Sequence, residues 1–314
     1  MSKSFKQNGK KFGKRLGMQT LEEKAMMAGD VAVSVSGGDL IINEAADSIG
    51  GDQQVQVSQL ENGKLRVQGL NGTQIETQAI IYNRELGRRE RITIHVDSLD
   101  YNVSGGIDVD LGEGRDNFTT SAGGPTLSTQ FMDIDMGDGN DRDFVALRNA
   151  AVDEQVNITT GGGNDSVSLH TVQVGEGGDN DGDLTIETGN GQDLVSMYKV
   201  GVSDDVVIDM ALSQSLAERD TLMMNQVAIH DDLEVDFGGG NDKFDFFYSS
   251  VDEADIEAGA GDDDVVAIGS VADDFNYDGG TGTDEFWAFY SNGVDTNDID
   301  LDLSSAVRRT YGQV

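Results

Sequence analysis

The chain has 314 residues, 41 of them glycine and one proline, and its formal net charge is −37. This charge far exceeds what solubility needs and destabilises a compact fold by self-repulsion, so cations are the expected partners. Duplex DNA and anionic lipid require basic surfaces and are excluded as partners of the body. Cysteine is absent, which excludes disulfides, and no apolar run is long enough to predict a membrane span.

The first 30 residues differ in charge from everything that follows. Up to residue 15 they carry six bases and no acid: Lys3, Lys6, Lys10, Lys11, Lys14 and Arg15. A basic start without an apolar stretch is not a conventional signal peptide. The next segment, MQTLEEKAMMAGDV, resembles the LExLExRxLLAGDV-like segment near the start of many planctomycete exported and surface proteins. The resemblance implies export and a β-rich body; the alternative is a short basic amphipathic helix of no particular destination.

Residues 31–90 are predicted to form a strand-rich N-terminal cap. Apolar and polar residues alternate through Val33, Val35, Leu40 and Ile42, and turn signals stand at residues 62–63 and 71–72, both Asn-Gly. A stacked β-fold needs such a cap because its terminal coil is an open sheet edge. A basic cluster follows, which we expect to pair with neighbouring acids rather than to bind a ligand: Arg84, Arg88, Arg89 and Arg91.

A repeated unit occupies most of the remaining chain. Its copies read IDVDLGEGRDNFT, DIDMGDGNDRDFVAL, NITTGGGNDSVSL, TIETGNGQDLVSM, VDFGGGNDKFDFF, IEAGAGDDDVVAI and NYDGGTGTDEFWAF. The shared pattern is U-x-U-G-x-G-x-D-x-U-x-U, in which U is mostly apolar. Two alternating runs are the signature of half-buried strands, so each copy predicts two strands joined by a glycine turn.

One aspartate closes the turn of each copy: Asp116, Asp141, Asp165, Asp193, Asp242, Asp263 and Asp284. In the second copy Asp143 is an alternative to Asp141, because it fits the register of Val145 and Leu147 better. We interpret IDMALSQSLAERDTLMM as a further copy with a remodelled loop that closes on Asp220. The copies then recur every 21 to 28 residues.

A third strand-like element ends each copy, as in VAIHDD and GSVADD. Three short strands in about 24 residues predict a parallel β-helix in which each copy is one coil. We therefore expect an all-β, right-handed parallel β-helix of eight to nine coils over residues 91–303, followed by a C-terminal tail at 304–314. Coils about 4.8 Å apart would make a rod on the order of 40 Å long.

The glycine turn suggests calcium. Glycine and aspartate tolerate left-handed backbone, so GxGxD can turn sharply at a coil corner and point its carboxylate outward. Stacked carboxylates about 5 Å apart repel one another unless a cation lies between them, and oxygen ligands suit Ca²⁺. Residues 107–290 resemble the GGxGxDxUx repeats of RTX, or haemolysin-type, proteins, in which the aspartate and loop carbonyls of stacked turns hold Ca²⁺. Carried over, this implies as calcium ligands Asp116, Asp141, Asp165, Asp193, Asp242, Asp263 and Asp284.

The copies also depart from the RTX pattern. The first glycine is absent from nearly every copy and is kept at Gly279, and the motif occurs once per coil rather than about every nine residues. The interpretation is therefore a three-sided β-helix with one RTX-like corner. The alternative is that asparagine and aspartate only cap corners in water. A second acidic column is interpreted as a solvated charged face: Asp205, Asp231, Asp232, Asp252, Asp273 and Asp295.

The sequence favours an exported structural or adhesive cell-surface protein without enzymatic activity. The alternatives are a carbohydrate-binding module and a lyase-like polysaccharide enzyme. The further expected partners are cell-surface polysaccharide, other surface proteins and, through end-to-end self-association, other copies of the rod. A lyase of that kind needs a basic residue beside carboxylates, and the few bases of the repeat region do not align in successive coils. The histidines His95, His170 and His230 are widely separated. The best aromatic group for glycan binding is Phe247, Tyr248, Trp287 and Tyr290.

Overall fold

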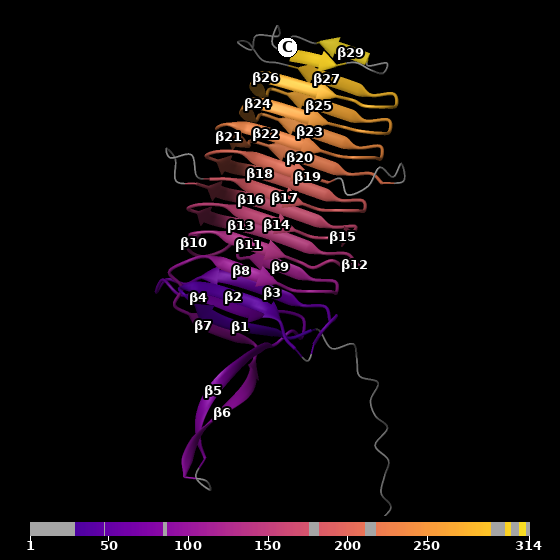
Figure 1. Ribbon diagram of the computed structural model, residues 1–314. Helices are drawn as coiled ribbons and strands as arrows, with labels where there is room; N and C mark the ends of the chain where they lie inside the picture. The colour runs from indigo at the N-terminus through magenta and orange to yellow at the C-terminus, as the bar shows by residue number, and fades with distance from the viewer. Residues whose placement is uncertain are drawn as a thin grey trace, which may run out of the picture.

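A computed structural model describes residues 29–46, 48–83, 87–175, 182–210 and 218–289, and the backbone of residues 299–302 and 308–311. Every regular element in this part of the chain is a β-strand, and most strands join one continuous sheet that winds along the long axis of the molecule (Figure 1). The expected basic export segment, residues 1–30, lies outside the described residues except for its last two.

Three columns of parallel strands form the sides of the solenoid. The first face contains β8 (Ile107–Asp110), β11 (Met132–Asp135), β14 (Val156–Thr159), β17 (Leu184–Glu187), β19 (Val206–Asp209), β22 (Asp232–Asp236), the ends of β24 (Ser250–Glu257) and β26 (Val271–Asp278), and β28 (Ile299–Asp302). The second face contains β9 (Asn117–Thr120), the starts of β13 (Phe144–Val152), β16 (Ser166–Val174) and β18 (Leu194–Val202), then β20 (Thr221–Asn225), β23 (Lys243–Phe247), β25 (Asp264–Ile268), β27 (Glu285–Phe289) and β29 (Arg308–Tyr311).

The third face is the shortest. It contains β10 (Leu127–Thr129), the ends of β13, β16 and β18, β21 (Ala228–Ile229), and the starts of β24 and β26. Two short strands, β12 (Asn140–Asp141) and β15 (Gly162–Gly163), pair at the corner between the first two faces. Seven coils have all three sides within the described residues, which confirms the predicted parallel β-solenoid.

The core is a single apolar column that runs the length of the stack. The alternating residues that predicted the strands point inward: Leu233 and Val235 are each 1% exposed, Phe244 is fully buried and Phe246 is 1% exposed. Aliphatic residues fill the early coils, whereas rings fill the late ones, with Phe246 and Phe275 at 6.4 Å between centroids. Because each side chain packs on the equivalent residue of the next coil, burial is continuous rather than divided among separate cores.

An antiparallel cap covers the first coil. It consists of β1 (Val31–Ser36), β2 (Asp39–Glu44), β3 (Gln54–Gln59), β4 (Leu65–Gly69), β5 (Ile75–Asn83), β6 (Arg88–Val96) and β7 (Ser98–Tyr101). Strands β2 and β3 pair in parallel with β8 and β9, so they continue the first two faces. Residues 62–63 lie in the hairpin turn of β3 and β4, whereas residues 71–72 turn between β4 and β5, which do not pair. The cap extends to Tyr101, past the expected boundary at residue 90.

Strands β5 and β6 form a long hairpin that projects from the cap (Figure 1). Its outer part carries exposed apolar side chains, among them Ile80 at 67% and Tyr82 at 63% exposure. The basic cluster expected here is partly described, and Arg88 forms an ion pair with Glu90 at 3.1 Å. At the other end, β29 pairs with β27, so the solenoid includes residues that the sequence placed in the C-terminal tail.

Candidate functional site: the aspartate ladder and its corners

The GxG turns form one corner of the solenoid, between the first and second faces, which we call the glycine corner. In the copy at residues 259–263, both glycines have positive φ, +86° at Gly259 and +153° at Gly261. A Cβ on Gly259 would lie 1.7 Å from the carbonyl oxygen of Gly238, and one on Gly261 would lie 1.3 Å from that of Gly240. Glycine is therefore required at both positions of this turn for two reasons. The backbone conformation disfavours other residues, and the preceding coil leaves no room for a side chain.

The turns also bond directly to one another. The backbone N–H of Ala260 donates to the carbonyl of Gly238, and that of Thr281 donates to the carbonyl of Gly259, at 2.9 and 2.8 Å. A side-chain series runs beside them, in which Asn241 Oδ1 accepts from the N–H of Asp262 at 3.0 Å. Several turn carbonyls are therefore already occupied by bonds between coils.

The closing aspartates form a continuous chain of hydrogen bonds, which we call the aspartate ladder. In each step Oδ1 of one aspartate accepts from the backbone N–H of its counterpart one coil earlier; the N–H of Asp193, for example, donates to Asp220 at 2.7 Å. The chain begins with the N–H of Gln53 in the cap, which donates to Asp116 at 2.6 Å. The ladder consists of Asp116, Asp143, Asp165, Asp193, Asp220, Asp242, Asp263 and Asp284.

All ladder carboxylates are buried, with no more than 3% of each residue exposed. This corrects the expectation that the turn points its carboxylate outward: the turn folds the side chain back so that Oδ1 satisfies a backbone N–H of the preceding coil. The second oxygen, Oδ2, is buried without a hydrogen-bond partner in six of them: Asp116, Asp165, Asp193, Asp220, Asp242 and Asp263. An ionised carboxylate in such a place is costly unless a proton or a cation neutralises it.

Burial dominates the ionisation of the ladder. It raises the pKa of Asp116 and Asp220 to about 8, against the opposing effect of the backbone N–H that each accepts. Burial likewise raises the pKa of Asp143, Asp193 and Asp263 to about 7. The pKa of Asp242 rises to about 6, and the nearby Arg219 lowers it in part. Neighbouring aspartates add to the increase at Asp116, Asp143, Asp193, Asp220 and Asp263, so these carboxyls keep their protons to a higher pH than an ordinary aspartate.

One member of the ladder differs from the first sequence interpretation. In the second copy the ladder residue is Asp143, whereas Asp141 is exposed. The reason is local: Asn140 and Asp141 form the short strand β12 with β15, which places Asp141 outside the turn and lets Asp143 close it. In the copy with the remodelled loop, Asp220 occupies the ladder as the spacing indicated, with 0% exposure.

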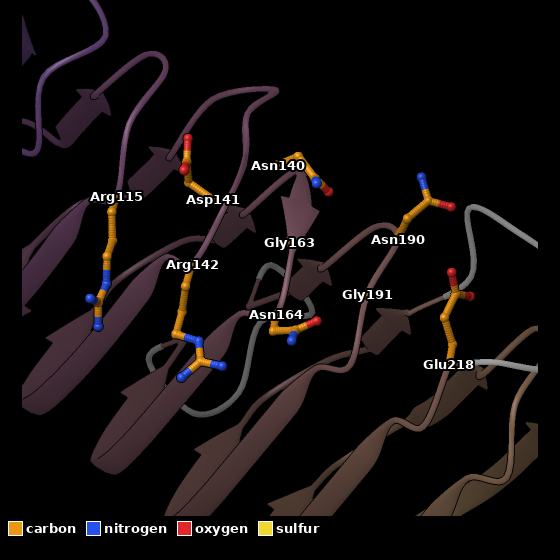
Figure 2. Close-up of a pocket in the computed structure, with 9 residues that line it drawn as sticks. All are labelled: Arg115, Asn140, Asp141, Arg142, Gly163, Asn164, Asn190, Gly191 and Glu218. Atoms are coloured by element: carbon orange, nitrogen blue, oxygen red, sulfur yellow. The ribbon is translucent and has the colours of Figure 1, made fainter.

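Outside the glycine corner lies a groove of about 520 Å³. It crosses adjacent coils and is lined by Arg115, Asn140, Asp141, Arg142, Gly163, Asn164, Asn190, Gly191 and Glu218. Figure 2 shows the side chains of Arg115 and Arg142 running in the same direction from neighbouring coils. Arg142 lowers the pKa of the buried Asp165 in part, although burial raises it overall. The groove therefore combines basic, amide and carboxylate groups rather than a dense set of acids.

The second acidic column predicted from the sequence forms a different corner, between the third and first faces, which we call the acidic corner. Carboxylate oxygens there lie within 4.8 Å of one another in two overlapping groups, Asp183 with Asp204 and Asp205, and Asp205 with Asp231 and Asp232. Burial, Asp231, Asp205 and Asp252 together raise the pKa of Asp232. These side chains are exposed or partly exposed, and Asp295 of the expected column lies outside the described residues.

The histidines are not part of a common site. His95 Nδ1 lies 3.0 Å from Asp30 Oδ2 in the cap. His170 contacts Tyr198 on the second face, with ring centroids 5.0 Å apart, and His230 lies on the third. In the described part of the chain, no helix is long and apolar enough to cross a membrane.

A comparison with models of known protein families gives no match to this chain, and a comparison with curated proteins gives no similar sequence.

Proposed function

We propose that the protein is an exported structural or adhesive rod of the cell surface with no catalytic role. The observation that supports this proposal most directly is the aspartate ladder, which joins every coil to the next inside a continuous apolar core. A solenoid joined in this way resists bending and fraying along its whole length, because each coil lends its hydrogen bonds to two neighbours. Such an arrangement suits a spacer or scaffold.

The N-terminal resemblance supports export. The segment MQTLEEKAMMAGDV precedes the cap, which is the position that the corresponding segment has in exported and surface proteins with β-rich bodies. The net charge of −37 suits a location where divalent cations are abundant, because they can neutralise a body that otherwise repels itself.

We further propose that Ca²⁺ binds to the rod. The buried, unpartnered Oδ2 atoms of the ladder fit a cation, since each is a hard oxygen that lacks any donor. Ca²⁺ takes about six to eight oxygen ligands, and each of these six aspartates provides one such oxygen, so turn carbonyls or water must supply the rest. Bound there, the ion would supply positive charge that replaces the proton. The carboxylates of the acidic corner are the second group that Ca²⁺ would neutralise.

A thermal melt of the full chain, followed by circular dichroism at pH 8, tests the calcium proposal. A ligand that binds only the folded state raises the midpoint, so we expect a higher midpoint with millimolar Ca²⁺ than with EDTA, and little change with Mg²⁺. Asp220→Asn should reduce the increase if the ladder holds the ion. Asp205→Asn is the matched control for the acidic corner. Equal midpoints in Ca²⁺ and EDTA would exclude calcium and leave the structural role intact.

A further inference from the structure

From β18 to β27 the outward side of the second face carries a Tyr or Phe on every second coil, and His170 of β16 precedes Tyr198 in the same column. One column of side chains, in register from β18 to β27, reads Tyr198, Asn225, Phe247, Ile268 and Phe289. With coils about 4.8 Å apart, the rings of Tyr198, Phe247 and Phe289 repeat at about 10 Å along the rod. All three are partly exposed. We call this set the aromatic column.

Another ring widens the aromatic column near its C-terminal end. Trp287 lies beside Phe289 with centroids 6.5 Å apart and an interplanar angle of 18°, so the two rings are nearly parallel. The indole N–H of Trp287 donates to Glu285 Oε2 at 3.2 Å, which fixes the orientation of the ring. Flat, fixed rings lose little conformational entropy when a ligand stacks on them.

Tyr248 occupies the corner next to Phe247, and 64% of its surface is exposed. Its φ is +51°, a left-handed conformation that is unfavourable for a bulky residue but that recurs at the equivalent position of successive coils, at Asn149, Thr171, Lys199, Gln226 and Gly269. The ring lies over the next coil, where the residue is Gly269; a Cβ there would be 2.8 Å from Tyr248 Cδ1. The glycine therefore makes room for an exposed ring at this corner, and a ligand can stack on that ring.

We propose that the aromatic column binds a neutral, linear β-1,4-linked polysaccharide that runs parallel to the rod axis. In such a chain every second sugar ring presents the same face to the protein. The aromatic column likewise presents a ring on every second coil, so the sugars and the rings match two to two. Sugar rings stack on aromatic faces, and Asn225 between the rings offers hydrogen bonds to hydroxyl groups.

Charge limits the choice of ligand. The body carries an excess of acid, which repels anionic polysaccharides and single-stranded nucleic acid, although nucleic acid also stacks on aromatic side chains. The proposal goes beyond the structural role, and it does not depend on calcium because no ladder residue belongs to the aromatic column.

The only tryptophan of the chain, Trp287, provides a direct readout. Fluorescence of the full-length protein should change and saturate on titration with cellohexaose, xylohexaose or chitohexaose, and at least one of the three should protect Trp287 from iodide quenching. Polygalacturonate, an anionic chain, should have no effect. The absence of saturable change with all three neutral probes, or tighter binding of polygalacturonate, would overturn the proposal.

Variants separate binding from folding. Tyr248→Asn relieves the unfavourable backbone, so we expect an unchanged or higher melting midpoint together with binding weakened about tenfold. Tyr82→Ala removes a similarly exposed ring from the distant β5–β6 hairpin and should bind normally. If Tyr248→Asn binds as well as the wild type, or if Phe247→Ala changes only the sedimentation coefficient and not sugar binding, the face is a contact between protein copies and the proposal is wrong.

Discussion

The aspartate ladder and the acidic corner are both columns of carboxylates repeated at the spacing of the coils, yet their environments are opposite. Ladder carboxylates are buried and each accepts a backbone N–H, whereas those of the acidic corner are exposed or partly exposed and lie close to one another. Asp205 of the acidic corner also accepts a backbone N–H, from Asp232 at 3.1 Å, but that hydrogen bond is exposed to water. Identical chemistry thus serves internal bonding at one corner and surface charge at the other. The role of a repeated aspartate therefore depends on whether its turn directs the side chain into the protein or into solvent.

The largest expected effect is the pH dependence of stability. The folded-state pKa values of Asp116 and Asp220 are about 8, against about 3.9 for an unfolded aspartate. Between these values the folded state binds more protons than the unfolded state, so the free energy of unfolding falls as pH rises. Melts in EDTA should show the midpoint highest near pH 4 and several degrees lower at pH 9.

A ladder variant sharpens this result. Asp220→Asn keeps the Oδ1 acceptor but cannot ionise, so it should be more stable than the wild type at pH 9 and should gain nothing at pH 4. Asp205→Asn in the acidic corner is the control, and 0.5 M NaCl should reproduce its effect because exposed charges are screened. A wild-type midpoint that rises steadily from pH 4 to pH 9 would contradict the assignment of protons to the ladder.

The second effect concerns the glycine corner. Gly261→Ala introduces a Cβ that would lie 1.3 Å from a backbone oxygen at a φ of +153°, and we expect it to lower the free energy of unfolding by about 3 kcal/mol or more. Gly123→Ala is the matched control, because a Cβ there meets no atom within 4 Å. Equal midpoints for the two variants in urea unfolding would mean that the turns do not pack as closely as described.

The smallest effect isolates one hydrogen bond. Asp220→Ala leaves the buried N–H of Asp193 without its acceptor, which should cost about 1–3 kcal/mol at pH 5, where the carboxyl is protonated. Asp205→Ala at the acidic corner removes an exposed hydrogen bond from the N–H of Asp232, which water can replace, and should change the free energy of unfolding by less than about 0.5 kcal/mol. Hydrogen exchange at the amide of Asp193 should be faster in the first variant alone; unchanged exchange there would argue against the ladder bond.

The same comparison explains what the sequence could and could not predict. Alternation at Leu233, Val235 and Phe244 predicted the strands and the core, and the alternation on both sides of the altered loop, together with the spacing, identified Asp220. The burial of the ladder was missed because a period of two describes strands and says nothing of where a turn residue points. Asp141 was preferred to Asp143 because the turn of the second copy is two residues longer. The extra residues, Asn140 and Asp141, form β12 and are of the same types as the residues that close the other turns.

The projecting β5–β6 hairpin was missed as well. Its residues alternate like any half-buried strand, and no local feature signals that both faces would be exposed. The sequence predicted an aromatic group that included Phe247 but not Tyr198. Tyr198 and Phe247 lie in one column only through the register of β18, β20 and β23, which the sequence did not provide.

The ladder steps span only 21 to 28 residues, so the fold has a simple arithmetic of length. Removing residues 243–263 would join Asp242 directly to Asp264 and make the rod one coil shorter. The N–H of Asp242 would then face Asp284, so each ladder N–H would still face an aspartate. A gene can therefore lengthen or shorten such a rod in whole coils by duplication or deletion. The length of the rod can therefore change in steps of one coil while the hydrogen-bond pattern of the ladder is preserved.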